Sequence, residues 1–122
     1  MNFVSYKSLL YEKLADQKTV LLSAEKSIFL NAVNICNISD INIRLNLQIV
    51  RLLEDPIKES FLVQNVIIQP NESKNLMHLG NLEVYLQDGD SILCFSDGYG
   101  QLFDCTICYT ELNEESVCGQ KL

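Results

Sequence analysis

The sequence predicts an all-β protein in which two antiparallel sheets pack as a sandwich, and three observations support this fold class. Apolar and polar side chains alternate without a break over residues 41–49, which gives a strand one dry face and one wet face. Turn signals recur about every eight to twelve residues, the spacing typical of a sandwich. No stretch within residues 19–112 has the length of the crossover helix that parallel strands require. A small closed barrel is the competing arrangement of the same strands.

The N-terminal segment differs from the rest and predicts a short amphipathic helix. Its apolar residues recur at spacings of three and four with charged residues among them, and they are Phe3, Tyr6, Leu10 and Leu14. A helix this short is marginal in water, so we expect it to dock on another surface. That surface is either an open end of the chain's own sheet or a neighbouring subunit. Residues 1–17 are therefore expected to form a helical arm.

The first half of the β region contains three expected strands. A short one covers residues 19–23, and a longer one covers 27–38, where the apolar positions change parity and so predict a bulge or a bend between sheets. The residues at 37–40 bond readily to their own backbone and predict a tight connection. The strand at 41–53 follows, and Pro56 lies beyond its end because proline cannot donate to a strand ladder.

The second half continues in the same way. Its strands are expected at residues 61–69, 75–79, 82–87, 91–96 and 102–112. Asp97-Gly98-Tyr99-Gly100 predicts the loop of a final hairpin, since glycine readily adopts positive φ. Residues 18–112 therefore form the sandwich domain, of the jelly-roll or immunoglobulin-like kind. The polar residues 113–122 are expected to form a flexible C-terminal tail.

Composition and charge limit the classes of partner. The chain of 122 residues is 48% apolar, which suffices for one domain whose core needs no metal or disulfide. Its net charge of −7 argues against nucleic acid or an anionic membrane as a partner. No apolar run is long enough to span a membrane, and residues 1–11 lack the apolar stretch of a signal peptide. We expect the protein to stay in, or assemble in, a cytoplasm.

The sequence contains 5 cysteines and no export signal, so we expect free thiols, most of them buried. Cys105 and Cys108 have C-x-x-C spacing, but residues three apart in a strand point to opposite faces. Their sulfurs are therefore not expected to converge on a metal or a disulfide. Cys94 is expected near Cys105 across the last hairpin, although a cross-strand disulfide is not expected in a reducing compartment.

No group of side chains has the pattern of a catalytic or metal site. His78 is the single histidine and lies near a turn, where a surface or hydrogen-bonded role is ordinary. Asp88, Asp90 and Asp97 lie on expected turns; calcium is an alternative use of such oxygens, but the EF-hand pattern is absent. We predict no catalytic residue, no cofactor, no metal and no small-molecule substrate, and hence no enzyme.

The wet face of the 41–49 strand carries little charge. Its residues are Asn42, Arg44, Asn46 and Gln48. A face that is merely solvated, in a chain of net charge −7, is expected to carry several charges. We therefore expect this face to be partly covered in an assembly, by a subunit or by the N-terminal arm, with Asn46 among the contact residues.

Four segments of residues 18–112 form a recognisable pattern. They are a short and a long strand (residues 19–22 and 31–35), the alternating strand at 41–50, a strand leading to the turn Pro70-Asn71-Glu72-Ser73, and an apolar strand with a Gly-Asp turn (86–92) followed by the final strand to Leu112. In this pattern the chain resembles small β-sandwich virion proteins of tailed bacteriophages. Five cysteines and a helical arm depart from that pattern.

The resemblance implies a non-enzymatic structural subunit of a phage capsid, neck or tail that works in repeated copies through protein–protein contacts. It implies other virion structural proteins as partners, a homo-oligomeric state and assembly in the host cytoplasm, with no nucleic acid and no membrane as partner. No catalytic residue is carried over. Phe3, Tyr6, Leu10, Leu14 and Asn46 are the expected interface residues. The alternative is a carbohydrate- or receptor-binding module whose loop residue Tyr99 stacks on a sugar.

Overall fold

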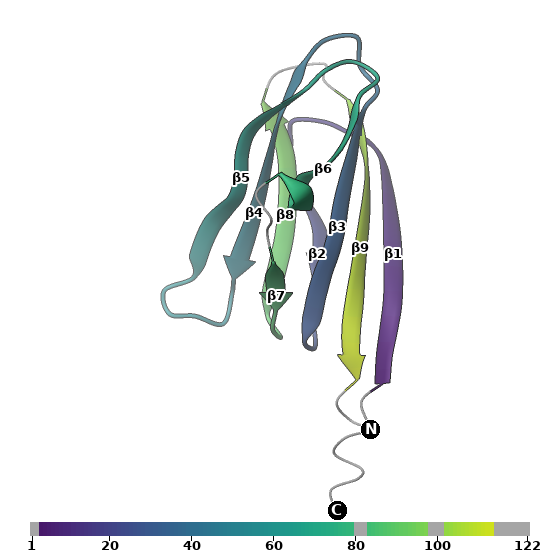
Figure 1. Ribbon diagram of the computed structural model, residues 1–122. Coiled ribbons are helices and arrows are strands. Elements are labelled where there is room, and N and C mark those ends of the chain that lie inside the picture. Colours follow the sequence, from purple (N-terminus) through teal and green to yellow (C-terminus); the bar gives the residue numbers. More distant parts are fainter. Residues whose placement is uncertain (1–2, 80–82, 98–101, 114–122) are drawn as a thin grey trace, which may run out of the picture.

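Two antiparallel sheets lie face to face in the computed structural model, which describes residues 3–79, 83–97 and 102–113 (Figure 1). One sheet has the strand order β1-β9-β3-β6, with β7 pairing to β3 as well, and the other has the order β2-β8-β4-β5. The elements are β1 (Phe3–Leu14), β2 (Thr19–Ser23), β3 (Ile28–Asn37), β4 (Ile43–Arg51), β5 (Lys58–Ile68), β6 (Ser73–Asn75), the 3-10 helix η1 (Leu76–His78), β7 (Val84–Leu86), β8 (Asp90–Asp97) and β9 (Phe103–Asn113). The prediction of an all-β fold with two antiparallel sheets is confirmed.

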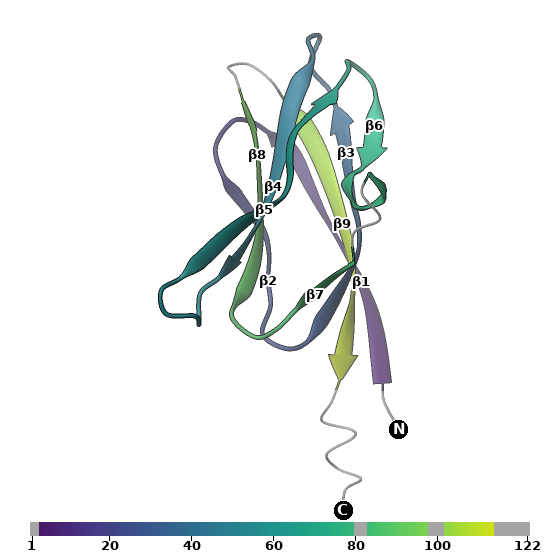
Figure 2. The same ribbon diagram turned by 60° about the vertical axis from the view of Figure 1, so that its left-hand side comes forward.

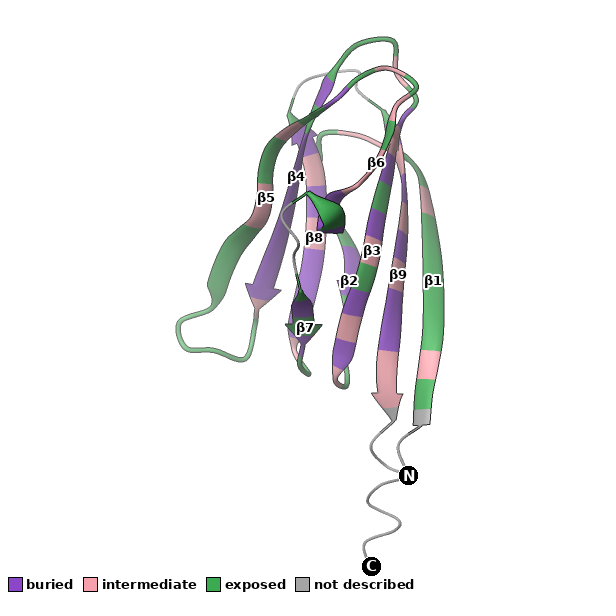
Figure 3. Cartoon of the chain, in the orientation of Figure 1, coloured by how far each residue is buried: buried purple, intermediate pink, exposed green. Residues whose placement is uncertain are grey.

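A single hydrophobic core fills the space between the two sheets, and β4 contributes its centre. Ile43, Leu45 and Leu47 are fully buried, as the alternation predicted for the dry face. Ile41 precedes β4 and is 46% exposed, so the dry face begins two residues later than expected. Figure 3 shows burial continuing along β4, while β1 is largely exposed.

Residues 3–14 form an edge strand, so the expectation of an N-terminal helical arm is wrong. β1 pairs with β9 from Phe3 opposite Asn113 to Leu14 opposite Phe103. An isolated helix of this length has only its own hydrogen bonds, whereas β9 offers a row of backbone partners and a sheet on which to pack. The same segment also alternates as a strand does, and tertiary pairing decides between the two periodicities.

Other expectations at the level of single elements have mixed outcomes. The expected bulge in the 27–38 strand is present, as a register shift against β9 between Leu30 and Ala32. Instead of a strand at residues 75–79, the chain forms the end of β6 and the helix η1. β8 and β9 belong to different sheets, so they do not form the expected final hairpin. The loop residues 98–101 and most of the expected tail, residues 114–122, lie outside the described residues.

The loop between β4 and β5 projects from the rest of the molecule (Figure 2), and the turn before β8 is fastened to the end of β4 beside that loop. The guanidinium of Arg51 donates to the buried carboxylate of Asp90 at 2.9 Å. Gly89 has φ of 93°, and a Cβ atom at this position would lie against the side chain of Leu53. The left-handed backbone conformation therefore favours glycine at this position.

One buried side chain ties together the connections at the end of the molecule opposite the start of β1. The Nδ2 atom of Asn37 donates to the carbonyls of Ile41 and Ile68, at 2.8 and 2.9 Å. Its Oδ1 atom accepts from the backbone N–H of Ser39 at 2.9 Å. Asn37 is fully buried and thereby joins β3, the turn that follows it and the end of β5.

Replacing Asn37 with Ala should lower the free energy of unfolding by about 3 kcal/mol, because the buried amide loses its hydrogen bonds to the carbonyls of Ile41 and Ile68 and from the N–H of Ser39. Urea denaturation measures this loss. Asn34→Ala, an exposed asparagine of the same strand, is the matched control and should change stability little. Equal losses for the two variants would show that the hydrogen bonds of Asn37 contribute nothing special.

Tyr11 closes one side of the core by joining the edge strands of the two sheets. Its hydroxyl donates to the backbone carbonyl of Leu21, on β2, at 2.7 Å. Burial raises the pKa of the Tyr11 phenol above its ordinary value, and burial does the same to the pKa of Tyr109 on β9. Both phenols are therefore held in the neutral form more firmly in the folded than in the unfolded protein.

Stability should fall as the pH rises above about 10, the ordinary pKa of tyrosine, because the unfolded chain then releases protons that the folded protein retains. The stabilisation is complete below the unfolded pKa and is lost as the pH rises through the folded pKa. Tyr11→Phe removes one of the two groups, so the fall should be shallower. Urea denaturation across the alkaline range measures the slope for the wild-type protein and for Tyr11→Phe. A wild-type slope in Tyr11→Phe would contradict this account.

Candidate interaction surface

The outer face of the β1–β9–β3 sheet is set by the alternation of β9. Ile107 and Tyr109 are buried in the core, so Thr106, Cys108 and Thr110 point outward. β1 and β3 flank β9 on either side, and their registers place outward-facing residues beside these three. The three strands lie side by side (Figure 1), so cross-strand rows of side chains run over the outside of this sheet.

The first row is aromatic at its ends and crosses four strands. Tyr6 lies opposite Thr110, Thr110 opposite Phe29, and Phe29 opposite Tyr85 of β7. The rings of Phe29 and Tyr85 are 4.7 Å apart between centroids and tilted by 44°, an attractive aromatic arrangement. Tyr6 is 81% exposed and Tyr85 is 61% exposed, so most of their apolar surface faces solvent.

A shallow hollow of about 410 Å³ lies beside this row. Tyr6, Ser8, Asn31 and Cys108 surround it, together with the neighbouring positions Lys7 and Tyr109. Asn31 is the extra residue of the β3 bulge, and its Oδ1 atom accepts from the hydroxyl of Thr110 at 2.8 Å. The bulge thus helps to form one wall of the hollow.

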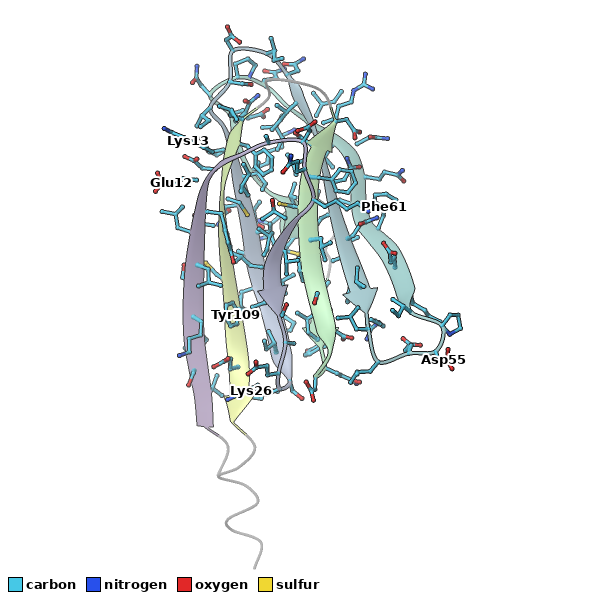
Figure 4. All side chains as sticks on the ribbon, turned by 180° about the vertical axis from the view of Figure 1, so that it is seen from behind. Glu12, Lys13, Lys26, Asp55, Phe61 and Tyr109 are labelled. Atoms are coloured by element: carbon cyan, nitrogen blue, oxygen red, sulfur yellow. The ribbon has the colours of Figure 1, made fainter. Side chains whose placement is uncertain are left out.

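Uncharged residues continue through the next two rows, Ser8–Cys108–Ala32 and Leu10–Thr106–Asn34. We call the surface made by these rows the uncharged face; its residues are Tyr6, Ser8, Leu10, Phe29, Asn31, Ala32, Asn34, Tyr85, Thr106, Cys108 and Thr110. Charged side chains begin beyond it, with Glu12 and Lys13 towards the end of β1, as Figure 4 shows. Leu10 is 62% exposed, so this face is apolar as well as uncharged at its edge.

The outer side of the other sheet is different in charge. Arg44 lies opposite Asp97 there. The ammonium group of Lys18 lies 5.3 Å from the ring centroid of Phe95 and 4.0 Å from a carboxylate oxygen of Glu59. The two outer sides of the molecule are therefore unlike, and the charge concentrates away from the uncharged face.

The backbone edge of β1 is less suited to contacts than the face beside it. β1 ends the strand order of its sheet, so one side of its backbone lies at the sheet edge. Lys7 lies opposite Tyr109 and therefore points toward the inner side of the sheet, a device that discourages another strand from pairing at an edge. A register shift between Tyr11 and Leu14 interrupts the edge further. The uncharged face is thus the better candidate site.

The structure separates the five expected interface residues. Tyr6 and Leu10 lie on the uncharged face, whereas Leu14 is partly buried and packs against the core. The side chain of Phe3 lies outside the described residues. Asn46 lies on β4, in the other sheet, so the five do not form one surface.

Asn46 is buried by its own chain and is 2% exposed. Its Oδ1 atom accepts from the backbone N–H of Asn65 at 2.9 Å, and its Nδ2 atom donates to Asp97 at 3.3 Å. Phe95 lies opposite Asn46, and Phe61 lies opposite its neighbour Gln48. The expectation that Asn46 and Gln48 lie on a wet face is therefore wrong, because both side chains are buried beside residues of β5 and β8. The N-terminal segment, expected as a possible cover, forms β1 in the other sheet.

Other residues that the sequence singled out do not form a common site. Cys105 is buried and Cys108 lies on the outer side, which confirms that the C-x-x-C sulfurs point to opposite faces. His78 is exposed at the end of η1, and Asp90 is paired with Arg51. Within the described residues, no group of three or more His, Cys, Asp or Glu side chains is placed to hold a metal ion. Tyr99, the expected sugar-stacking residue, lies outside the described residues.

The part of the face contributed by β3, β7 and β9 was not expected from the sequence. Phe29, Asn31 and Tyr85 were not predicted as contact residues, because their strands are not neighbours in sequence. A usable signal was present in the first segment, where Val4, Tyr6, Ser8 and Leu10 alternate as outward residues of a strand do.

No protein-family model and no curated protein matches this sequence. None of the helical segments that the structure describes has the length and apolar character needed to cross a membrane. We therefore infer function from the surface of the chain itself.

Asn46→Lys should lower the free energy of unfolding by about 2 to 3 kcal/mol, because it removes two hydrogen bonds and places a charge in a buried position. Gln64→Lys, an exposed position on β5, is the matched control and should be nearly neutral. Urea denaturation of the two variants measures the difference. A stable Asn46→Lys protein would contradict the burial of this side chain.

Proposed function

We propose that this chain is a non-enzymatic structural subunit that assembles in repeated copies through its uncharged face. The observation that carries the proposal is the contrast between this face and the chain as a whole. The net charge is −7, yet three adjacent rows of the sheet carry no charged side chain. The partner that we infer is a second copy of this chain.

Charge explains why a second copy suits this face. Two acidic molecules repel one another, and contact through charged surfaces would add the cost of desolvating those charges. The uncharged face avoids the desolvation cost and keeps the charges of the two copies away from the contact. Its exposed Tyr6 and Leu10 supply apolar area, and the hollow beside Tyr6 has room for a side chain of a neighbour.

The strand order supports a more specific form of the proposal. β6 and β7 both pair with β3, and counting them as one interrupted strand leaves eight strands. The two sheets then have the orders 1-8-3-6 and 2-7-4-5, which is the order of a jelly roll. Jelly rolls build viral capsid proteins, and also lectins and cupins, so the argument from fold is an analogy.

Together with the resemblance to small virion proteins of tailed bacteriophages, the strand order favours a capsid, neck or tail accessory subunit. Such a protein assembles in the host cytoplasm and becomes a component of the particle, with other virion proteins as further partners. A broad surface with exposed Tyr6 and Leu10 suits a protein partner, because protein interfaces spread over many residues. Carbohydrate binding is therefore an outcome for the experiment to exclude.

Sedimentation velocity over a range of concentrations tests the assembly. The wild-type protein should form a larger species as concentration rises, and Leu10→Lys should weaken association by about tenfold or more. Val20→Lys is the matched control, because Val20 is 50% exposed on β2 in the other sheet. Both changes make the chain less acidic, so a loss confined to Leu10→Lys cannot come from general charge repulsion.

A wild-type protein that stays monomeric at high concentration would contradict assembly through a second copy. Equal weakening by Leu10→Lys and Val20→Lys would contradict the assignment of the face. Binding of the monomer to a glycan array, abolished by Tyr6→Ala, would favour the carbohydrate-binding alternative instead.

A further inference from the structure

Two buried cysteines face one another across the core. Cys94 lies on β8 and Cys105 on β9, which belong to different sheets, and both side chains are 0% exposed. Cys94 lies opposite Leu47 in its sheet, and Cys105 lies opposite Ile35 in the other. Both cysteines therefore belong to the hydrophobic core, one from each sheet.

Both thiols enter the same hydrophobic core from facing sheets. Cys105 lies close enough to Cys94 to be the main cause that raises the pKa of the Cys94 thiol. This separates them from the other cysteines that the structure describes. Cys36 and Cys108 are half-buried, and their neighbours in the strand place them on the outer side of the sheet. Two buried thiols that enter one core from facing sheets are candidates for an inter-sheet bond.

We propose that Cys94 and Cys105 form an inter-sheet disulfide when the chain folds in the presence of a disulfide oxidant such as oxidised glutathione. One thiolate attacks a sulfur of glutathione disulfide and releases one glutathione thiolate, which leaves a mixed disulfide on the protein. The second cysteine then attacks the protein-bound sulfur and releases the other glutathione. The protein loses two electrons and two protons, and two reduced glutathione molecules are formed.

The order of folding and oxidation decides the outcome. In the folded dithiol both sulfurs are shielded from solvent, and the neighbouring Cys105, together with burial, raises the pKa of Cys94. The thiolate that must attack is therefore scarce in the native protein. Oxidation takes place during folding or after transient opening, and the native dithiol resists it. This property is independent of the proposed assembly.

The test uses a variant that retains only this pair, with Cys36, Cys108 and Cys118 each changed to Ser. The variant is unfolded in urea and refolded in buffer with reduced and oxidised glutathione, or with reductant alone. Peptide mass mapping should find Cys94 joined to Cys105 only in the first sample. The temperature midpoint of unfolding of that sample should rise by about 10 °C, because the crosslink restricts the unfolded chain.

The wild-type protein is treated in the same way as a control, in case the three substitutions impair folding of the variant. Its map should show the same linked peptides. As a further comparison, native dithiol protein incubated with oxidised glutathione should keep Cys94 and Cys105 reduced while Cys36 and Cys108 react. Two free thiols, or two glutathione adducts, at Cys94 and Cys105 after oxidative refolding would overturn the proposal.

Discussion

The amide of Asn37 holds the end of the molecule where the chain crosses between its two sheets, and the rest of the structure depends on that crossing. It binds carbonyls from the turn before β4 and from the end of β5, while the backbone of the same residue joins the turn at residues 69–72. A strand displaced by one residue would send its apolar side chains to the wrong side. Fixing both connections at one point therefore fixes which residues of β3 and β4 enter the core and which remain outside.

The outer surfaces follow from this arrangement. With β3 held in place, β9 and β1 pair onto it, and their outward residues fall into uncharged rows. The other sheet places Phe61 and Phe95 beside its polar residues, and it carries the ion pairs of Lys18 and Arg51. One outer side of the molecule therefore presents three uncharged rows, and the other presents charged groups.

Short-range patterns of side chains predicted the features that depend on neighbouring residues in the sequence. The dry face of β4, the turn at Asn37 and the bulge of β3 all follow from short-range side-chain patterns, and the structure contains them. What lies against each face depends on distant strands. Asn46 looked solvated because nothing near it in sequence indicated Phe95, and the segment from Phe3 looked helical because β9 lies far along the chain. The proximity of Cys94 and Cys105 was expected within a hairpin, whereas the chain crosses to the other sheet between them.

The pairing of the first strand with the last has a consequence for how the molecule is tethered. Phe3 lies opposite Asn113, so chain entering β1 and chain leaving β9 pass through the same end of the molecule. The turns organised by Asn37 lie at the other end, as Figure 1 shows. A polypeptide joined before Phe3 and another joined after Asn113 would therefore emerge side by side. A pulling force applied to both would act on the β1–β9 ladder from that end. Its hydrogen bonds would break one after another before the core is strained.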